Sequence, residues 1–586
     1  MNKVALLRDQ MKSHGIDFWI IPSSDPHQSE YVSSKWQGRA WISGFTGSAG
    51  TVVITQDHAG LWTDSRYFIQ ADQQLDQSIW SLHKMVDSSS QGYIDWLAEQ
   101  AKEGQTIGFN GFTFSAKAIQ SLKNKLNVSK VEVKADLDLL DDIWEDRPGL
   151  PMAEVIDLSV EFTGESRESK LGKIKNFAQE QGLDHYLLSS LDDIAWLLNI
   201  RSRDIAFNPV VLAYFLYSQG QFELFISDGK LSDDLKTDLE SADLSIRDYN
   251  SLVDRIAQID QGTFGLNVST ASFNVYQSIQ TKIKAVSDYT ALAKAIKNET
   301  EVGHIRHAMK KDGVALIRAI MELEETVKTN TISEYEFARV IIKHRAAQEH
   351  YFGESFDAIV GYKGNGAIVH YKPEKDTAAQ IENDGWLLLD CGAQYFDGTT
   401  DITRCFSFTA ATEEQKEAYT LVLKGHISLA MARFPKGTVG RQLDILARQA
   451  LWNHGKDYGH GTGHGVGFFL NVHENPQGFA AARSPRNETP FEAGMLTSNE
   501  PGYYLENEFG IRIENLVLCK QSEFDGFLDF ETVTLFPIDT AMIQYQLLTR
   551  SEVAWLNSYN QKVYEELSPL VDEKERLWLE NRCKAI

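Results

Sequence analysis

Three of the chain's 15 histidines lie within the seventeen residues HGTGHGVGFFLNVHENP, from His460 to Pro476. His460 and His464 have the i, i+4 spacing of a helical zinc pair. Four glycines between positions 461 and 467 disfavour a helix there, because glycine destabilises a helix interior, and they favour extended or looped backbone instead. The histidines therefore need partners from distant parts of the chain to form a metal or catalytic site.

Two acidic residues flank a predicted hairpin in LLLDCGAQYFDGTTDITR. A buried strand ends on Asp390, and the chain turns and returns through Asp401. A turn centred on residues 395–396 would place the two side chains directly opposite, with Cβ atoms roughly 5 Å apart, whereas a turn on residues 397–398 would separate them by roughly 13 Å. Two facing carboxylates repel each other, so a close pair would indicate a cation between them.

Two further carboxylates interrupt apolar strand patterns nearer the C-terminus. Glu500 precedes a proline, which holds it extended, and the alternation in GIRIENLVL places Arg512 and Glu514 on one face of a strand. Each acid alone is more often a satisfied surface or turn residue. With His464 and the hairpin pair, however, they make one histidine and four carboxylates, whose charge matches two divalent cations. Such a set favours ions such as Mn²⁺, and two ions about 3.5–4 Å apart can hold a bridging hydroxide and polarise a carbonyl.

The elements that must position these residues form the last of three regions. Helical periodicity extends from about residue 293 to 327. The chain then becomes glycine-rich and strand-like up to about residue 540, with helices expected near residues 413–433 and 440–454. The tail TRSEVAWLNSYNQKVYEELSPLV is expected to be helical again.

An internal repeat precedes this region. The stretch LRDQMKSHGIDFWIIPSSDP, from Leu7, matches IKNFAQEQGLDHYLLSSLDD, from Ile174, at a constant offset of 167 residues. Each copy is typical of a helix, a strand and a serine-rich turn, followed by hairpin-like alternation. The sequence therefore predicts an α/β (α+β) protein with two similar α/β domains over residues 1–150 and 151–295 and a catalytic domain over residues 296–586.

The composition excludes several classes of function. With 82 acidic against 57 basic residues, the formal net charge is -25, which argues against a nucleic-acid or membrane-surface role and suits a substrate with a free amino group. The four cysteines form no CxxC pair and indicate reduced thiols. The N-terminal segment is typical of a helix followed by a strand rather than a signal peptide, and no stretch approaches eighteen apolar residues. We expect a cytoplasmic protein.

Five motifs lie in the last region: NGAIVHY (365–371), LLLDCGAQYFDGTTDITR (387–404), GHGTGHGVGFFLNVHE (459–474), NEPGYY (499–504) and GIRIEN (510–515). In their order and approximate spacing they resemble those of the Xaa-Pro aminopeptidase (aminopeptidase P) family, in particular its longer, three-domain cytosolic branch. PSSDPHQSEYV and SGFTGSAGTVVIT extend the resemblance into the first domain. It implies two tandem creatinase-like N-terminal α/β domains, a pita-bread metallopeptidase domain and, as is common in the family, a homodimer.

The resemblance also implies a role for each candidate residue. The ligands of two divalent ions would be Asp390, His464 and Glu500, together with Asp401 and Glu514, which would bridge both ions. Glu500 would also act as general base. His370 and His473 match histidines that hydrogen-bond the substrate and stabilise the tetrahedral intermediate. His460 matches a further active-site histidine, and Arg512 matches an arginine beside the metal site that orients carboxylates and belongs to the substrate-binding group.

The implied reaction is hydrolysis of the N-terminal Xaa-Pro bond of peptides with proline at the second position. The proline nitrogen carries no hydrogen, so this bond requires a dedicated pocket. Aromatic residues in EHYFGESFDAIVGY (349–362) are candidates for that pocket, although aromatics at such spacing are more often part of a core. Mn²⁺ is the expected metal, with Co²⁺ and Zn²⁺ as alternatives.

Other functions remain open at this point. A prolidase, which cleaves only Xaa-Pro dipeptides, would share the metal ligands, but the tandem N-terminal domains favour the aminopeptidase. A methionine aminopeptidase is less favoured because it needs no N-terminal extension of two domains. A metal-free pita-bread protein that binds peptides or histones would have lost ligands, and all five are present here. The tail aromatics Trp555, Tyr559 and Tyr564 are expected either to contribute to a subunit interface or to pack on the core.

Overall fold

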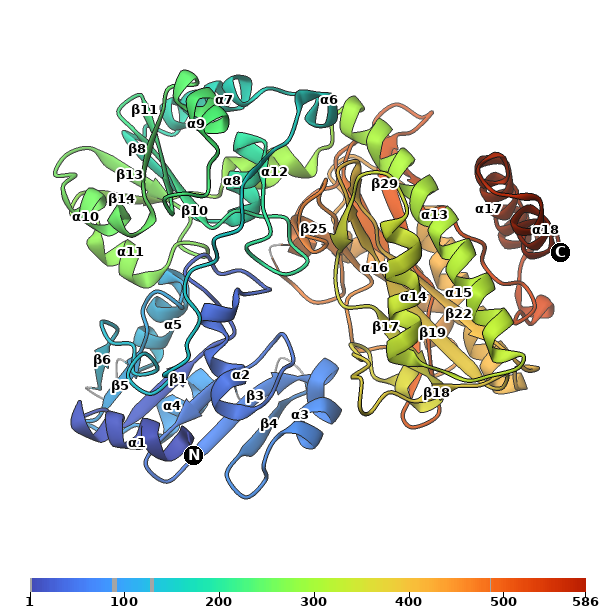
Figure 1. Cartoon of the computed structure of the whole chain (residues 1–586), viewed down its shortest axis with the longest axis horizontal. Helices are drawn as coiled ribbons and strands as arrows, with labels where there is room; N and C mark the ends of the chain where they lie inside the picture. The colour runs from blue at the N-terminus through green and yellow to red at the C-terminus, as the bar shows by residue number, and fades with distance from the viewer. Residues whose placement is uncertain (1–2, 87–91, 127–130, 485) are drawn as a thin grey trace. The chain divides into compact units, whose positions relative to one another are not determined.

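The computed structural model describes residues 3–86, 92–126, 131–484 and 486–586. The chain forms two compact units, one of residues 1–157 and 165–290, the other of residues 158–164 and 291–586 (Figure 1). The domain boundaries predicted from the sequence stay a prediction. None of the helices among the described residues is long and apolar enough to cross a membrane.

The first unit contains two six-stranded sheets with the same strand order, which confirms the predicted tandem repeat. The order is β4-β3-β2-β1-β5-β6 in one sheet and β12-β11-β10-β8-β13-β14 in the other. The strands of the first sheet are β1 (Phe18–Ile21), β2 (Thr51–Ile54), β3 (Ala59–Asp64), β4 (Ser81–Met85), β5 (Thr106–Phe109) and β6 (Glu132–Lys134). Those of the second are β8 (His185–Leu188), β10 (Ala213–Ser218), β11 (Gln221–Ile226), β12 (Leu244–Asp248), β13 (Thr263–Leu266) and β14 (Lys282–Ala285).

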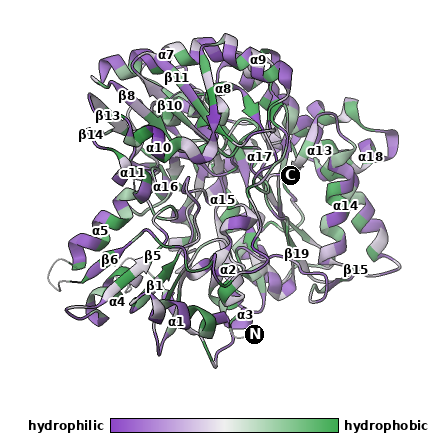
Figure 2. Ribbon diagram, turned by 60° about the vertical axis from the view of Figure 1, so that its left-hand side comes forward, coloured by the Kyte–Doolittle hydropathy of each residue, from purple (hydrophilic) through white to green (hydrophobic). Residues whose placement is uncertain are grey.

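Helices with one apolar face pack on these sheets. In α5 the residues Ala116, Ile119, Leu122 and Leu126 are buried, a spacing that places them on one side of a helix. Figure 2 accordingly shows both hydrophobic and hydrophilic residues along α5. The longer helices of this unit are α1 (Lys3–Ser13), α4 (Tyr93–Gln100), α5 (Ala116–Leu126), α7 (Arg167–Glu180), α8 (Leu191–Leu198) and α9 (Asp233–Ser241).

The long helical region near the start of the catalytic domain is divided into two helices. The single helix predicted over 293–327 is wrong: α12 (Tyr289–Ala295) ends, and α13 (Glu299–Val327) starts afresh after three residues. The reason is a capping box, in which Asn298 and Glu301 satisfy each other's backbone N–H groups. The helix α13 packs against α14 (Glu334–Ala346) (Figure 1).

Three larger sheets and a hairpin carry the candidate site. The sheet β17-β19-β22 consists of β17 (Ile359–Tyr362), β19 (Trp386–Cys391) and β22 (Ile402–Ser407), and β16-β20-β21 of β16 (Tyr351–Glu354), β20 (Ala393–Tyr395) and β21 (Gly398–Thr399). A six-stranded sheet has the order β23 (Arg433–Pro435), β30 (Phe527–Thr532), β29 (Asn515–Gln521), β26 (Leu496–Asn499), β24 (Gly463–Gly465) and β25 (Glu474–Phe479). The separate hairpin pairs β27 (Gly502–Leu505) with β28 (Phe509–Arg512).

Three of the remaining helices, α15 (Glu413–Ala430), α16 (Gly440–Trp452) and α17 (Arg550–Leu567), lie close to where the sequence predicts them, whereas α18 (Glu573–Arg582) follows the predicted helical tail and was not predicted. The tail aromatics pack on the core of their own unit. The Tyr559 hydroxyl donates to the Phe536 carbonyl at 2.9 Å, Trp555 stacks on the Tyr559 ring, and Tyr564 packs against the same core cluster.

The register of the acidic hairpin differs from both predicted alternatives. Asp390 pairs with Thr403, and the same register continues to the end of the hairpin, so the turn is centred on residues 396–397. Each predicted turn is therefore wrong by one residue. Asp390 and Asp401 lie diagonally on one face, where Cα atoms are about 7–8 Å apart. YFDG offers turn residues at several positions, and the pairing of the flanking buried strands decides between them.

Candidate metal centre

Three side chains of ligand type converge from distant parts of the second unit. One ligand atom from each of Asp401, His464 and Glu514 lies within 4.8 Å of the others, and all three residues are buried. Asp401 precedes β22, His464 lies in β24, and Glu514 joins β28 to β29. The strand arrangement therefore brings together three of the five predicted ligands.

The His464 ring is oriented for ligation. Its Nδ1 lies 3.0 Å from the Gly465 carbonyl oxygen, so we assign the ring proton to Nδ1, which leaves the lone pair on Nε2. Nε2 faces Asp401 Oδ2 at 3.5 Å and Glu500 Oε1 at 3.4 Å. The Ser498 hydroxyl accepts a hydrogen bond from the backbone N–H of His464 at 2.9 Å and donates to Glu500 Oε1 at 3.1 Å. A backbone carbonyl on the second ring nitrogen is how proteins fix metal-ligating histidines.

Arg512 and Thr403 hold the two other carboxylates. Arg512 donates to Asp390 Oδ2 from Nη2 at 2.5 Å and from Nε at 3.2 Å. Thr403 donates to Glu514 Oε2 at 2.7 Å. Asp390 Oδ1 is buried and has no hydrogen-bond partner among the residues that the structure describes. A buried acceptor without a donor is costly, and a bound cation would satisfy it.

The site carries more negative charge than the protein neutralises. Four carboxylates face one guanidinium, that of Arg512, which leaves a formal charge of −3 when the imidazole is neutral. Burial, and then the neighbouring carboxylates, raise the pKa values of Asp401 and Glu514 well above their usual range. Burial also raises the pKa of Glu500 to about 7. One imidazole nitrogen among buried, mutually repelling carboxylates is a donor set that fits hard or borderline divalent cations.

Two more predicted histidines lie at this cluster. The His473 ring packs against the His464 ring, with centroids 4.3 Å apart and planes at 75°. His460 Nε2 lies 2.8 Å from the Tyr504 hydroxyl, which also accepts from Arg512 Nη1 at 2.6 Å. His460 is therefore connected to the carboxylate cluster through Tyr504 and Arg512.

His370 is flanked by two fixed neighbours. The hydroxyl of Tyr371 donates to Glu334 Oε2 at 2.7 Å, and Glu334 is fully buried at the start of α14. On the other side, the Val369 carbonyl accepts from Arg512 Nη2 at 3.4 Å. These contacts place the His370 segment beside Arg512.

The sequence reasoning missed several residues that support the ligands. Thr403 follows Asp401 by two residues, and Ser498 precedes Glu500 by two. In extended chain, side chains two residues apart point to the same face, so Thr403 is expected on the side of Asp401 and Ser498 on the side of Glu500. That signal was available in the sequence. The contact of Tyr504 with Arg512 depends on the register of β27 against β28, which the sequence does not reveal.

His426, in the middle of α15, is another residue that the sequence did not indicate. Its Nδ1 donates to the Asn499 carbonyl at 3.1 Å, and the Asn515 side chain donates to its Nε2 at 3.0 Å. Burial lowers the pKa of His426 to about 3, so the ring is neutral. Asn499 and Asn515 pair across β26 and β29 and adjoin Glu500 and Glu514 in sequence. His426 therefore ties together the two strand ends that carry these carboxylates.

The glycines around His464 allow close packing of strands. A Cβ on Gly463 would lie 1.9 Å from the Ser498 carbonyl oxygen, and one on Gly465 would lie 2.5 Å from the Glu474 carbonyl oxygen. The strand β24 lies between β25 and β26, which explains both contacts. The prediction of extended backbone is confirmed, and the close approach at these two positions is to neighbouring strands.

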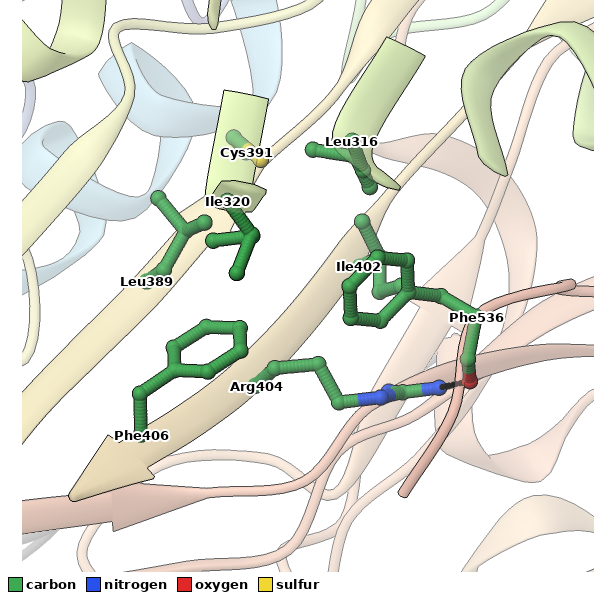
Figure 3. A pocket seen from close by; sticks show the side chains of 8 residues that line it. All are labelled: Leu316, Ile320, Leu389, Cys391, Ile402, Arg404, Phe406 and Phe536. Atoms are coloured by element: carbon green, nitrogen blue, oxygen red, sulfur yellow. Dashed lines mark hydrogen bonds between the residues drawn. The ribbon is translucent and has the colours of Figure 1, made fainter. Parts of the chain in front are cut away.

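A small cavity lies beneath the sheet β17-β19-β22, on the side of Leu389 and Cys391 rather than of Asp390. Its volume is about 10 Å³, room for one water molecule at most. Figure 3 shows its aliphatic and aromatic lining, with Arg404 donating to the Phe536 carbonyl at 2.7 Å. This cavity cannot hold a peptide.

One of the aromatics proposed for a proline pocket packs among other rings. Phe352 is 9% exposed, and its ring lies 6.4 Å from that of Phe396 and 5.1 Å from that of Phe469. This contact pattern is that of a core residue. Tyr362 is likewise buried in the core cluster of its unit, and the assignment of the other aromatics in residues 349–362 to the pocket stays a prediction.

The fold and the site define a metallopeptidase, and comparison with known proteins agrees. Residues 303–521 match Metallopeptidase family M24 and residues 526–586 match the C-terminal region of peptidase_M24. Residues 3–143 and 146–301 each match the Creatinase/Prolidase N-terminal domain. The predicted fold class, two creatinase-like domains followed by the catalytic domain, is confirmed.

Full-length relatives identify the family. The chain is 40% identical to Aminopeptidase P2 of Arabidopsis thaliana, over 98% of this chain and 86% of that protein. It is 38% identical to Xaa-Pro aminopeptidase 1 of Dictyostelium discoideum, over 100% and 96% of the two chains. The crystal structure of X-prolyl aminopeptidase from Caenorhabditis elegans, described as a cytosolic enzyme with a di-nuclear active site, superimposes with a TM-score of 0.95 at 33% identity, covering 100% and 99%. The chain belongs to the Xaa-Pro aminopeptidase (aminopeptidase P) family and is a hydrolase.

Proposed function

We propose that this chain hydrolyses the first peptide bond of peptides with proline at the second position, with two divalent cations at the carboxylate cluster. The observation that carries the proposal is the convergence of four carboxylates and one imidazole with a single guanidinium to neutralise them. The ligands would be Asp390, Asp401, His464, Glu500 and Glu514.

The protein groups have distinct tasks in this reaction. When bound, the cations would polarise the scissile carbonyl and lower the pKa of water. Glu500 Oε1 is oriented by Ser498 and can take the proton of the attacking water as general base. His473, packed on the His464 ring, can donate a hydrogen bond to the oxyanion of the tetrahedral intermediate.

Arg512 and His370 complete the proposed site. Arg512 fixes the orientation of Asp390 through two hydrogen bonds and contacts the segment that carries His370. His370 would hydrogen-bond the substrate from that segment. His460 would act through Tyr504 on Arg512, which makes it a supporting member of the site.

The finer properties are also proposals. The donor set, with one nitrogen and otherwise carboxylate oxygens, supports Mn²⁺, with Co²⁺ or Zn²⁺ as alternatives. We infer a homodimer from the family resemblance, and a cytoplasmic location from the cysteine pattern together with the description of the Caenorhabditis elegans protein as cytosolic. The net charge of -25 supports peptides with a free amino group, rather than nucleic acid, as binding partners.

Substrate length separates the aminopeptidase from a prolidase. The 40% and 38% identities to proteins named as aminopeptidases favour the former. The test is hydrolysis of Arg-Pro-Pro and of an Xaa-Pro dipeptide by chelated enzyme, with Mn²⁺, Co²⁺ and Zn²⁺ restored separately. We expect metal-dependent release of arginine from the tripeptide. Cleavage of the dipeptide alone would identify a prolidase, and no metal-dependent cleavage of either would favour a metal-free binding protein.

A further inference from the structure

A fully buried ion pair lies directly beside His473. The side chains of Lys297 and Glu474 are both 0% exposed, and Nζ contacts Glu474 Oε1. Glu474 is the residue after His473, and it pairs with Gly465, the neighbour of His464, across β24 and β25. Lys297 therefore holds the side chain of a residue whose backbone lies in the same short segment as His473. This segment positions the His473 ring against the His464 ring.

Lys297 is itself held at several points. Its N–H donates to the Gly494 carbonyl at 3.0 Å, and Nζ also donates to the Lys294 carbonyl at 2.8 Å. The preceding residue, Ile296, bridges to Met495. The ammonium group thus has a fixed position between the end of α12 and the start of α13. From there it can fix the position of the Glu474 carboxylate.

The approach of these segments is close enough to exclude side chains. A Cβ on Gly494, which has φ +100, would lie 2.8 Å from the Lys297 carbonyl oxygen. Only glycine fits such a position without strain. This tight backbone contact holds the lysine segment in place beside Glu474.

We propose that Lys297 is a positioning residue for His473. The inference rests on the proposed function, in which His473 stabilises the tetrahedral intermediate. Through Glu474, the Lys297 ammonium holds the backbone of the neighbouring His473 in the position that catalysis needs. Catalytic geometry is sensitive at this level, since misplacement by about 1 Å can cost about 100-fold in rate.

A purely structural role is the alternative, and the chain contains a matched control. In the first unit, Lys230 and Asp204 form a second ion pair with both side chains 0% exposed. Breaking either pair leaves a buried carboxylate without its ammonium, which is strongly destabilising. A difference between the two lysine variants in catalysis, rather than in stability, therefore reports on His473.

The experiment compares Lys297→Met with Lys230→Met, both loaded with Mn²⁺ and assayed on Arg-Pro-Pro well below their melting temperatures. We expect both variants to melt at lower temperature than the wild type and to retain two ions per chain. Lys297→Met should lose about 10- to 100-fold in kcat, as supporting residues do, with KM little changed, whereas Lys230→Met should keep the wild-type kcat. A wild-type kcat for Lys297→Met, or loss of metal from it, would overturn the proposal.

A second comparison tests whether the effect passes through His473. In a His473→Ala background, Lys297→Met should cause no further loss of kcat, and a full additional loss would contradict the proposal. If Lys297→Met does not fold, Lys297→Met/Glu474→Gln removes both charges, and a wild-type kcat for that folded variant would also contradict it. If His473→Ala keeps the wild-type kcat, the proposed function of His473 has failed. A crystal structure of the Lys297 variant then decides the positioning claim, by whether the His473 ring has moved from His464.

Discussion

Buried carboxylates in ion pairs of the first unit and in the metal centre differ in how their charge is compensated. In the first unit Asp204 is paired with Lys230, and Glu223 contacts both Arg247 and Arg255. In the metal centre four carboxylates share one guanidinium. Each carboxylate of the first set has a cationic partner of its own, whereas the four carboxylates of the metal centre outnumber their cationic partner, and Asp390 Oδ1 has no donor among the described residues.

The difference separates structural charges from functional ones. Buried charges in proteins are paired, coordinate metals or shift their pKa values. Asp204 and Glu223 in the first unit are paired with cationic side chains. The metal centre has raised pKa values at three of its carboxylates, which is the state expected of ligands without their cation. A buried carboxylate with its own cationic partner therefore indicates scaffold, whereas a buried cluster whose carboxylates outnumber its cationic side chains indicates a cation site.

The largest expected effect is loss of activity when a ligand is removed. His464→Ala should reduce activity on Arg-Pro-Pro by more than about 100-fold. Mutation of residues that only support metal ligands already lowers metal affinity or activity by about 10- to 100-fold. The number of ions per chain, measured by elemental analysis, should fall below two. The matched control is His27→Ala, which removes a buried histidine of the first unit that bonds to Ser189 and Tyr249. That variant should lose stability but keep its metal, and full activity in His464→Ala would exclude His464 as a ligand.

The next effect contrasts stability in the two units. Asp204→Asn should cost about 3–5 kcal/mol of unfolding free energy, because it leaves the Lys230 ammonium buried without its counter-charge. Asp401→Asn should instead stabilise the chelated protein, since it relieves repulsion among carboxylates. Thermal melts of both variants in chelator measure the contrast. A lower melting temperature for chelated Asp401→Asn than for chelated wild type would show that the two units do not differ.

Removing the one guanidinium of the metal centre should have an intermediate effect. Arg512→Met frees Asp390 to rotate and takes away the contact with Tyr504. We expect a loss of about 10- to 100-fold in kcat and, in chelator, a lower melting temperature because the net negative charge increases. The measurement is steady-state kinetics with metal in excess. An unchanged kcat would place Arg512 outside the working site.

The smallest effect is a pH dependence of the metal-free protein. The pKa of Glu500 is about 7 in the folded state and near 4.5 ordinarily, so between these values the folded protein holds a proton that the unfolded chain has released. Stability from this group therefore falls as pH rises from about 4.5 to about 7. The glutamine of Glu500→Gln is neutral at every pH. In chelator, the melting temperature of this variant minus that of the wild type should therefore increase as pH rises from about 4.5 to about 7. A constant difference between the two proteins would contradict the raised pKa.

The sequence revealed those features that follow from local chemistry. The repeat was visible because β1 and β8 keep the same position within their copies, at residues 18–21 and 185–188. The candidate ligands were visible because acids in apolar strands violate a strong pattern. The break before α13 was missed because helical periodicity continues across it, although the capping pair Asn298 and Glu301 marks it.

What the sequence could not reveal depends on long-range register. The diagonal placement of Asp390 and Asp401 follows from strand pairing that two plausible turns left open. His426 looks like an ordinary helix residue, and only the pairing of Asn499 with Asn515 gives it partners. The pairing of Lys297 with Glu474 joins residues far apart in the chain, and no local pattern indicates it.

The most direct test of the central claim is the metal content of the purified chain together with its thermal response. If the charge imbalance marks a two-ion site, chelated protein should bind two divalent ions per chain on titration with Mn²⁺. Its melting temperature should rise and peptidase activity should return, and chelated Asp401→Asn should show neither change. A chelated wild-type chain that binds no Mn²⁺ stoichiometrically and keeps the same melting temperature would contradict the account.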